Sequence, residues 1–422
     1  MPETVVMKFG GTSVADAARL KRAAGRIVSR KDEGKRVVAV LSARGSTTDE
    51  LVAMAEEVSP RPDPRELDML LSTGERISCA LCAMAINDLG HRVISLTGSQ
   101  AGIVTDTSHT KARILDVRAD RIKEALENDS IVLVAGFQGV STSRDVTTLG
   151  RGGSDTTAVA VAAAVEADVC EIYTDVAGVF SADPRLVPDA RKLPVLSFEE
   201  MLEMAASGAK VLQLRAVEYA RNHGVRIHCR SSFDDAPGTV VVSQEETLEQ
   251  PLITAVTHST EEARVTLLGV PDEPGVAGRI FGALSEANVN VDMIIQNEPE
   301  SDGRQADMSF TVPRSDLGTA RQTLDGVAGQ LGIDRVATDE AMGKVSIVGA
   351  GMKSHPGVAA KVFSTLGEQG INIEMISTSP IKISCVIEGP QVPRAVQALH
   401  AAFELGTGEV RPENPFGGGG ER

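Results

Sequence analysis

The chain has 422 residues, 42% of them hydrophobic, and this length is too great for a single core, so it predicts two to three domains. Its 58 acidic and 42 basic residues give a formal net charge of −16, which opposes a broad electrostatic contact with nucleic acid or an anionic membrane surface. We therefore expect no nucleic-acid or membrane partner, and anionic ligands must be bound at local clusters of positive charge.

Up to about residue 245, short β-branched runs alternate with longer helical patterns. This alternation predicts an α/β domain with a mostly parallel sheet sandwiched by helices. Ser197 and Glu200 form a capping-box pattern before a helical run, which Gly208 is expected to divide so that a second helix begins near Lys210. The expected strands are Thr4–Phe9, Arg36–Leu41, Arg92–Leu96, Ile131–Val134, Val169–Thr174 and Val225–Cys229, and the expected helices are Ala15–Arg30, Glu66–Leu89, Val117–Glu127, Asp155–Glu166 and Glu199–His223.

The C-terminal third contains an internal duplication. Residues 265–294 align with residues 345–376, and each copy reads as a strand, a loop with Pro-Gly, a helix and a second strand that opens at Asn290 or Asn372. Each copy therefore predicts a small α+β sandwich. The predicted domains are 1–245, a linker with the first strand of the next region over 246–262, repeat units over 263–340 and 341–410, and a disordered Gly-rich tail over 411–422.

The cysteines and histidines give no sign of a disulfide framework or a metal centre. The five cysteines are an odd, scattered set in apolar stretches, and Cys79 and Cys82 lie inside a helical run, which favours core packing over redox chemistry. The seven histidines contain no i, i+4 pair, so no built-in metal site is expected. Because no secretory signal precedes Val5 and no apolar run approaches about 20 residues, we expect a soluble, cytoplasmic protein.

Two glycine loops follow the pattern of a strand that runs into a helix. They are Lys8-Phe9-Gly10-Gly11-Thr12-Ser13 and Gly150-Arg151-Gly152-Gly153-Ser154-Asp155. Backbone N–H groups and a helix dipole at such a loop can bind a phosphate, to which a lysine or an arginine adds charge. Taken singly, a Gly-Gly turn is more often a tight connection, Arg151 a solvated charge and Asp155 a helix cap. No Walker pattern occurs, which disfavours a P-loop fold, but two such loops in one domain favour anion chemistry.

These motifs resemble those of the aspartokinase family. Residues 6–14 (VMKFGGTSV) look like the aspartokinase signature, and residues 147–155 (TTLGRGGSD) resemble the second loop of the same family. The paired repeats resemble ACT domains, so the likeness implies an amino-acid kinase fold followed by two α+β ACT-like domains of the ferredoxin type. Further matching segments are Ser42-Ala43 with Thr47-Thr48, Gly74-Glu75-Arg76, Thr174-Asp175-Val176, Asp183-Pro184-Arg185 and Ser207-Gly208-Ala209-Lys210.

The resemblance implies ATP-dependent phosphorylation of the β-carboxylate of L-aspartate to 4-phospho-L-aspartate, the first step toward lysine, threonine and methionine. This acceptor is already ionised at neutral pH, so no general base is required. Lys8 and Lys210 would flank the transferring phosphoryl group, and Asp155 would hold both ammonium groups in place. Mg²⁺ would arrive with ATP, coordinated largely by phosphate oxygens and water, and no protein ligands for the metal are expected.

The resemblance also implies three sets of binding residues. For the substrate, Glu75 would bind the ammonium group and Arg151 a carboxylate, with Ser42, Thr48 and Ser154 as further contacts. For the nucleotide, the set is Lys8, Phe9, Gly10, Gly11, Thr12, Ser13, Thr174, Asp175, Phe180, Asp183, Arg185 and Lys210. For effector amino acids, lysine and threonine, the set is Asp272, Gly275, Ala277, Asn290, Asp292, Gln296, Asn372, Ile373 and Ser379.

Three positions depart from the family pattern. Glu298-Pro299-Glu300 and Pro380 fall near the expected effector interface, and Arg44 stands in an active-site loop where relatives commonly have Met. The two regulatory departures predict that inhibition by lysine plus threonine is weakened or retuned. The alternative is that these loops face solvent and vary without consequence, and Arg44 reads most simply as a solvated charge.

Two other functions stay open on the sequence alone. One is a different amino-acid kinase, acting on glutamate or acetylglutamate, and the other is a non-catalytic amino-acid sensor that keeps the kinase domain as a scaffold. Paired ACT-like domains imply association through their sheet edges, so we expect a homo-oligomer, or an assembly with a regulatory subunit that is made from an internal start.

Overall fold

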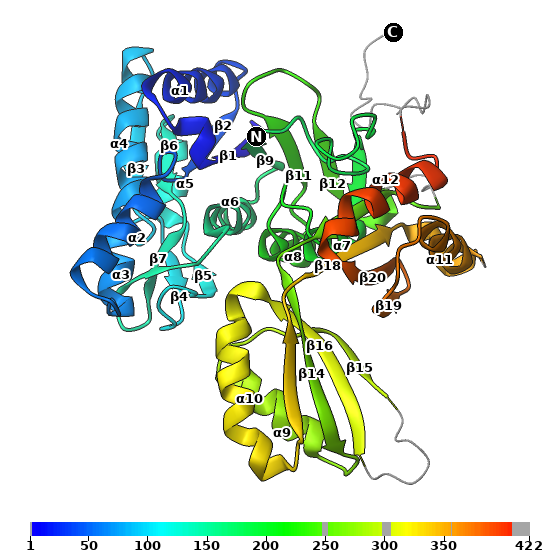
Figure 1. The fold of residues 1–422 in the computed structure, drawn as a ribbon. Coiled ribbons are helices and arrows are strands. Elements are labelled where there is room, and N and C mark those ends of the chain that lie inside the picture. The colour runs from blue at the N-terminus through cyan, green and yellow to red at the C-terminus, as the bar shows by residue number, and fades with distance from the viewer. Residues whose placement is uncertain (1, 247–251, 298–304, 356, 407–422) are drawn as a thin grey trace.

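An eight-stranded sheet, in the order β10-β12-β11-β9-β1-β2-β6-β3, runs through the N-terminal part of the chain (Figure 1). Each pair of adjacent strands in this sheet is parallel except β11 and β12, which are antiparallel. This confirms the predicted mostly parallel sheet. The computed structural model describes residues 2–246, 252–297, 305–355 and 357–406. The strands of this sheet are β1 (Thr4–Phe9), β2 (Arg36–Leu41), β3 (Val93–Leu96), β6 (Ile131–Ala135), β9 (Val169–Thr174), β10 (Val195–Ser197), β11 (Ile227–Ser231) and β12 (Thr239–Val242).

Helices cover both faces of this sheet, and the alternation along β1 shows how its side chains divide. Met7 and Phe9 pack with α1 and α4, whereas Val6 packs in the core beneath α5 to α8. The same alternation turns Lys8 toward α6. The helices are α1 (Ala17–Asp32), α2 (Thr47–Val58), α3 (Pro64–Leu71), α4 (Thr73–Asp88), α5 (Asp120–Glu127), α6 (Gly153–Ala164), α7 (Phe198–Ala206) and α8 (Leu214–His223), with 3₁₀ turns η1 (Gly11–Val14) and η2 (Gln244–Glu246).

The helix expected over residues 66–89 is wrong as a single element. It forms α3 and α4, which break at Ser72, whose carbonyl accepts a hydrogen bond from Gln138 Nε2 at 2.8 Å. The stretch from Pro64 to Asp88 is long and apolar enough to cross a membrane by length and composition alone, and 44% of its apolar window is buried inside the protein. Burial raises the pKa of the Cys79 thiol and raises that of Cys82 to about 12, so neither is a thiolate at neutral pH.

The predicted division of the next long helix is confirmed. Ser197 and Glu200 form the capping box at the start of α7, and α7 ends two residues before Gly208. The second helix, α8, begins at Leu214 and not near Lys210, so Lys210 lies in the loop between the two helices.

The sequence patterns do not predict the second sheet of this domain, which has the order β5-β4-β7-β8. Its strands have only three or four residues, too few for a legible alternation. A buried hydrogen bond of 2.7 Å between the hydroxyls of Thr105 and Thr147 ties two of them together, and the last strand leads directly into the loop at Gly150. The strands are β4 (Ile103–Thr105), β5 (Ile114–Val117), β7 (Gln138–Ser141) and β8 (Val146–Thr148).

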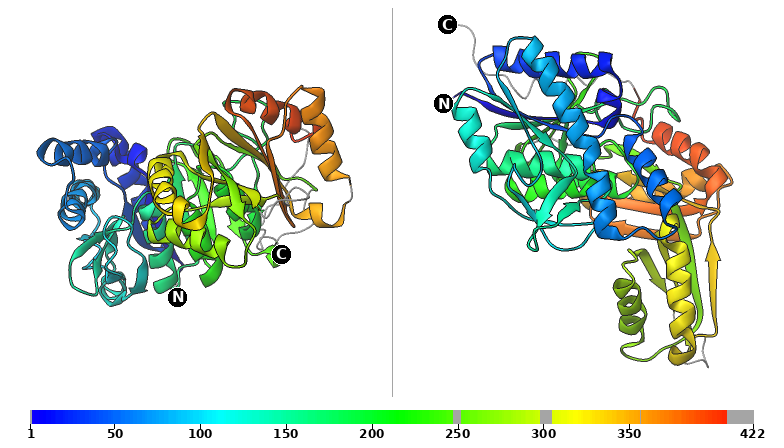
Figure 2. Two further views of the ribbon diagram at one scale, coloured as in Figure 1. Left: turned by 60° about the horizontal axis from the view of Figure 1, so that its bottom comes forward. Right: turned by 90° about the vertical axis from the view of Figure 1, so that its left-hand side faces the viewer.

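The C-terminal part forms two four-stranded antiparallel sheets of the same design, as the internal duplication predicts. The first repeat unit has the order β15-β16-β14-β17 and the second β13-β18-β20-β19. β13 precedes the first unit in the chain but pairs with β18 of the second, so the first unit is inserted into the second. Figure 2 shows the first unit projecting from the molecule while the second lies against the sheet domain.

The elements of the repeat units have the following bounds. The first unit has β14 (Glu262–Pro271), α9 (Val276–Glu286), β15 (Asp292–Gln296), β16 (Gln305–Pro313), η3 (Arg314–Asp316), α10 (Leu317–Leu331) and β17 (Arg335–Asp339). The second has β13 (Ala255–Ser259), β18 (Met342–Val348), η4 (Ala350–Ser354), α11 (Val358–Glu368), β19 (Met375–Ser379), β20 (Lys382–Glu388), η5 (Gly389–Gln391) and α12 (Val392–Ala402).

Buried hydrogen bonds join the second repeat unit to the sheet domain. Ser181 Oγ lies 2.9 Å from His400 Nε2 and donates to the carbonyl of Leu405 at 3.0 Å. Thr254 Oγ1 donates at 2.5 Å to Glu200, the capping-box carboxylate of α7. Buried polar groups must be paired, so these bonds fix the second repeat unit against the sheet domain.

Gly208 lies against the backbone of β13. Its φ is +106°, and a Cβ there would lie 2.0 Å from the carbonyl oxygen of His258 on β13. Gly208→Ala therefore meets both backbone strain and a collision, whereas Gly34→Ala, at φ +82° with open space, meets strain alone. We expect Gly208→Ala to lower the free energy of unfolding by about 1–3 kcal/mol more than Gly34→Ala does, measured by thermal and denaturant melting. Equal losses of unfolding free energy in the two variants would show that a side chain at position 208 does not collide with β13.

Candidate active site

A buried ion pair joins the end of β1 to the first turn of α6. Lys8 Nζ lies 2.5 Å from Asp155 Oδ1, and the two side chains are 12% and 7% exposed. The position of Asp155 in the first turn of α6 favours its negative charge through the helix dipole. Because charges this well buried must be paired, each holds the other at the carboxyl edge of the parallel sheet.

The first glycine loop lies backbone to backbone against the loop that follows β2. Gly45 N donates to the carbonyl of Gly11 at 3.0 Å, and a Cβ on Gly11 would lie 2.9 Å from the carbonyl oxygen of Ala43. Only glycine permits this approach without a shift of the backbone. The predicted substrate residue Ser42 lies beside the end of β1, where its N–H donates to the carbonyl of Phe9 at 3.1 Å, and Thr48 follows at the start of α2; both are half-buried.

Arg44 braces these two loops, so its interpretation as a solvated charge is wrong. It is half-buried, and its Nη2 donates to the carbonyl of Ala15 at 3.1 Å and its Nε to that of Val14 at 3.4 Å. These carbonyls end the 3₁₀ turn of the glycine loop, where backbone acceptors lack helical partners. The sequence pattern of the loop carried no signal of this role.

Glu75 is a buried carboxyl group with one unpaired oxygen. Its side chain is on α4, only 3% of the residue is exposed, and its Oε1 accepts from Ala43 N at 3.1 Å. Its Oε2 is buried without a hydrogen-bond partner among the described residues. Burial raises the pKa of Glu75 to about 7. An unpaired, buried acceptor beside the glycine loop is suited to a cationic group such as an ammonium.

The second glycine loop presents an unpaired guanidinium. Gly150 and Gly152 have φ values of +76° and +72°, and Gly152 caps α6. Ser154 is buried beneath Gly136, where a Cβ would lie 2.8 Å from the serine hydroxyl. Arg151 is exposed and makes no hydrogen bond or ion pair with another residue that the structure describes. Its planar fork is free to bind a carboxylate or phosphate.

Two side chains that sequence reasoning missed hold this loop in place. The Asp68 carboxylate, fully buried, accepts from Thr148 Oγ1 at 2.5 Å and from Thr110 N at 3.1 Å. The Arg215 guanidinium donates to the carbonyl of Leu149 at 2.7 Å. The signal that could have identified Asp68 is a carboxylate between the apolar residues Leu67 and Met69 of α3.

Two side chains of the first glycine loop are already engaged. Phe9 is buried and stacks on Tyr173 with ring centroids 4.8 Å apart, so its side chain is not available to a nucleotide. Ser13 is also buried, and its hydroxyl lies 2.6 Å from that of Ser232. A ligand at this loop can therefore be bound chiefly by the backbone of Gly10, Gly11 and Thr12.

The predicted nucleotide residues beyond β9 lie on the side of the sheet domain next to β13. Thr174 Oγ1 donates to Asp175 at 3.1 Å. Arg185 Nη2 lies 2.6 Å from Asp183, and this partner holds the pKa of Asp183 below its usual range. Phe180 is half-buried and packs against the core of the second repeat unit. Strand ends of an open parallel sheet are where such folds bind ligands.

Lys210 is not held by Asp155 in this structure. Its ammonium group pairs with Glu261, which comes from the turn between β13 and β14, and both side chains are 71% exposed. Asp155 therefore holds Lys8 alone, and the partner of Lys210 comes from the regulatory half of the chain.

The predicted effector residues lie on the edge strands β15 and β19, in the loops before them, and from the end of β14 to the start of α9. β15 and β19 lie against each other, with Met293 and Met375 in one apolar cluster. Two members already have partners, since Asp292 pairs with Lys344 at 2.8 Å and Ser379 Oγ donates to Glu203 at 3.0 Å. The departure at 298–300 lies outside the described residues. Gly275 caps α9 with φ +91°, and the rest are exposed or half-buried: Asp272, Ala277, Asn290, Gln296, Asn372 and Ile373.

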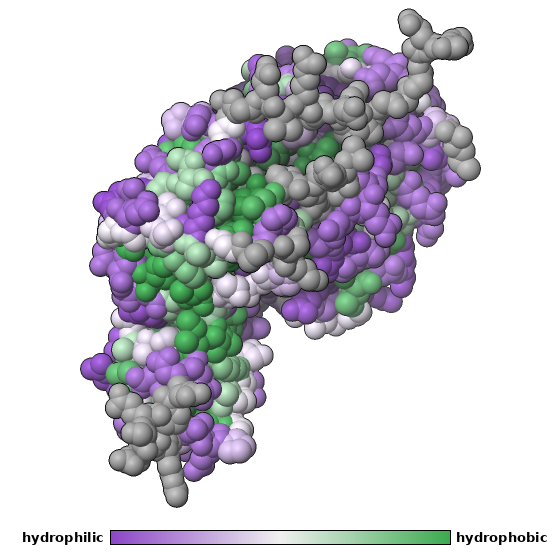
Figure 3. Space-filling model, turned by 90° about the vertical axis from the view of Figure 1, so that its right-hand side faces the viewer, coloured by the Kyte–Doolittle hydropathy of each residue, from purple (hydrophilic) through white to green (hydrophobic). Residues whose placement is uncertain are grey.

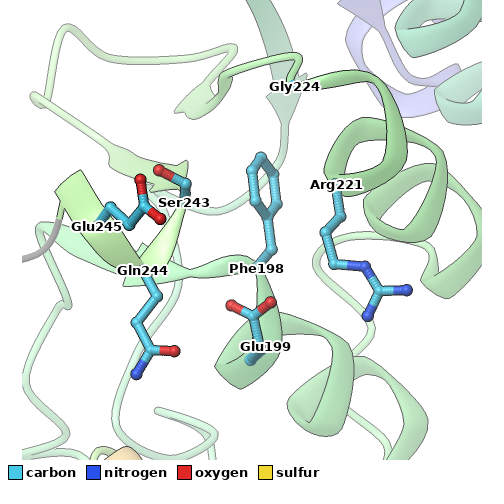
Figure 4. A pocket seen from close by; sticks show the side chains of 7 residues that line it. All are labelled: Phe198, Glu199, Arg221, Gly224, Ser243, Gln244 and Glu245. Atoms are coloured by element: carbon cyan, nitrogen blue, oxygen red, sulfur yellow. The ribbon is translucent and has the colours of Figure 1, made fainter.

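A cavity of about 460 Å³ lies away from all of these residues (Figure 4). Phe198 and Glu199 at the start of α7, Arg221 and Gly224 at the end of α8, and residues 243–245 line it. Because β12 runs antiparallel to β11, its end lies at the edge of the sheet opposite Lys8. None of the predicted site residues lines this cavity, so it is not part of the candidate active site.

Comparisons with known proteins agree with this arrangement. Residues 3–231 match the amino acid kinase family, and residues 264–329 and 345–403 each match the ACT domain. The aspartokinase of Mycolicibacterium smegmatis is 56% identical over 405 residues, which span 95% of this chain and 96% of the relative. That of Corynebacterium glutamicum is 52% identical over 405 residues, again 95% of this chain and 96% of the relative.

Solved structures give the same result for the fold. Escherichia coli aspartokinase III in complex with aspartate and ADP, in its R-state, has a TM-score of 0.83 at 27% identity, with 95% of this chain and 99% of that chain covered. The same enzyme with lysine and aspartate, in its T-state, has a TM-score of 0.73 at the same identity and coverage. The chain therefore belongs to the aspartokinases, with an amino acid kinase domain followed by two ACT domains.

Proposed function

We propose that this chain transfers the γ-phosphoryl group of ATP to the β-carboxylate of L-aspartate, with amino-acid control through its ACT domains. The observation that carries the proposal is the grouping of Lys8, Asp155, Arg151 and the unpaired Glu75 oxygen around two glycine loops at one edge of the sheet. The family that the chain belongs to supports it, since its relatives are named aspartokinases.

The substrate is recognised by opposite charges at its two ends. Arg151, exposed and unpaired with any described residue, binds a carboxylate of aspartate, and Glu75 binds the ammonium group through its unpaired Oε2. Ser42, Thr48 and Ser154 supply hydroxyl groups near these charges. A site of fixed donors and acceptors rejects analogues that leave a buried group unpaired, which favours aspartate over longer or acylated amino acids.

Phosphoryl transfer in this site depends on position and charge. Lys8, held by Asp155, and Lys210 neutralise charge that develops on the transferring group, and the start of α6 adds its dipole. The attacking β-carboxylate is ionised at neutral pH, so no side chain has to remove a proton from it.

The nucleotide lies between the first glycine loop and the segment from Thr174 to Arg185. Mg²⁺ accompanies ATP and neutralises its phosphates. Among residues 2–246, 252–297, 305–355 and 357–406, no group of three or more His, Cys, Asp or Glu could hold a metal ion.

The two ACT domains present apolar, unpaired edges that suit self-association. Ile294 on β15 and Ile376 on β19 are 53% and 42% exposed, both strands are edges of their sheets, and Figure 3 shows apolar side chains gathered on this face. An exposed apolar edge is covered most simply by a second copy. We therefore propose a cytoplasmic homo-oligomer, or an assembly with an internally initiated regulatory subunit.

Control by lysine and threonine is proposed to be weakened or retuned. Pro380 follows Ser379, whose hydroxyl binds Glu203 of the kinase domain, so the departure stands beside a contact between the two halves. We expect less inhibition with both amino acids present than the Corynebacterium glutamicum relative shows in the same assay. Matching inhibition curves for the two enzymes would contradict this expectation.

Loss of Lys8 should sharply lower turnover. Lys8→Ala is expected to lower kcat by roughly 10²- to 10³-fold, measured by ADP release and by trapping the acyl phosphate with hydroxylamine. The matched control is Lys31→Ala, which removes an ion pair with Asp129 on the far side of the domain and should leave kcat unchanged. Glutamate turnover without aspartate turnover by the wild type would contradict the proposed substrate.

The protonation of Glu75 should govern the affinity for aspartate. The charges of aspartate itself do not change between about pH 6 and pH 8. Because the pKa of Glu75 is raised to about 7, the free site carries a neutral carboxyl below that pH and a carboxylate above it. We expect kcat/KM for aspartate to rise with pH and level off above about 7, and Glu75→Gln to raise KM and flatten this profile. A wild-type profile that Glu75→Gln leaves unaltered would exclude Glu75 as the ammonium ligand.

A further inference from the structure

The turn between β13 and β14 brings a carboxylate of the regulatory region to the cations of the active site. Glu261 pairs with Lys210, the lysine that neutralises charge on the transferring phosphoryl group in the proposed function. Arg151, the proposed ligand of the substrate carboxylate, is also near enough to act electrostatically on Glu261, and with Lys210 it lowers the pKa of that residue. Glu261 is therefore ionised at neutral pH and stands where an anionic ligand is expected.

This turn is fixed by backbone contacts on both sides. His258 O presses on Gly208, two residues before Lys210. Glu261 N donates to Ser259 Oγ at 3.3 Å, and its carbonyl accepts from Arg314 N at 2.8 Å. The backbone of the turn therefore places Glu261 next to Lys210.

We propose that Glu261 is an internal competitor for the anion-binding cations of the active site and lowers the apparent affinity of the enzyme for ATP. The proposal rests on the proposed function, in which Lys210 binds phosphate. In the free enzyme the Glu261 carboxylate neutralises Lys210. When ATP binds, its phosphate oxygens must displace Glu261 from Lys210. Because both side chains are 71% exposed, water screens the pair and the exchange is easy, so the effect on affinity is modest.

The neighbouring residue couples this competitor to the effector region. Glu262 pairs with Lys344, whose ammonium group also lies 2.8 Å from Asp292 on β15, and Lys344 is almost fully buried. A buried lysine that loses its partners is costly, so these ion pairs hold β14, β15 and β18 together at this point. Any rearrangement of the ACT domains that shifts β14 moves Glu261 toward or away from Lys210.

The opposite role for Glu261 makes a different prediction. If Glu261 held Lys210 in the orientation needed for catalysis, its loss would raise KM for ATP or lower kcat. If it competes with ATP, its loss lowers KM for ATP and does not lower kcat.

The test is Glu261→Gln, with Glu286→Gln as the control that removes an exposed carboxylate at the end of α9. We expect Glu261→Gln to lower KM for ATP roughly two- to five-fold at low ionic strength, and the difference from wild type to shrink at high salt because exposed charges are screened. Glu286→Gln should match wild type throughout. An unchanged or raised KM for ATP in Glu261→Gln would overturn the proposal.

A double-mutant cycle separates failure of this proposal from failure of the proposed function. Binding of a non-hydrolysable ATP analogue is measured by calorimetry for wild type, Glu261→Gln, Lys210→Ala and the double variant. We expect Glu261→Gln to tighten binding in the wild-type background but not when Lys210 is absent. Tightening of equal size in both backgrounds would overturn the competition for Lys210. Absence of aspartate turnover by the wild type would refute the proposed function instead.

Discussion

The ion pair between Lys8 and Asp155 is the constraint around which the catalytic half is arranged. A lysine 12% exposed and an aspartate 7% exposed are tolerable inside a protein only when each neutralises the other. Lys8 comes from the central strand β1 and Asp155 from the first turn of α6, so the pair fixes the register between sheet and helix. The first glycine loop begins at Lys8 and the second ends at Asp155, so the ion pair brings both loops to one place.

Glycine is what allows the surrounding loops to close on this pair. Gly11 lies against Ala43 and Gly45, Gly152 against Gln213, and Gly208 against His258, each at a distance that a Cβ would not permit. The first two contacts shape the anion-binding loops, whereas the third joins the kinase domain to the strand β13 of the regulatory half. The same property of glycine thus serves catalysis and the connection between domains.

The sequence predicted what depends on local patterns and missed what depends on distant partners. The strand over Thr4–Phe9, the capping box at Ser197 and the break near Gly208 follow from periodicity and capping chemistry, and the structure has all three. The pairing of β13 with β18 joins segments about 90 residues apart across an inserted domain, and no local pattern signals it. Arg44 was missed because its partners are backbone carbonyls, and a backbone carbonyl is the same at every position in a sequence. Asp68 was missed because its partners, Thr110 N and Thr148 Oγ1, lie 42 and 80 residues further along the chain.

The charge balance of the site explains how so acidic a protein can bind anions. Lys8 is neutralised by Asp155 and Lys210 by Glu261, while the carboxyl of Glu75 is close to half-protonated at neutral pH. Only Arg151, of the three proposed cations, lacks a partner among the described residues. The free site is therefore nearly neutral, and binding of ATP or aspartate is an exchange of partners whose affinity is a difference between two sets of ion pairs. The affinity for ATP therefore changes when the regulatory half moves the single carboxylate of Glu261. The change is small, because the ion pair between Glu261 and Lys210 is exposed to solvent.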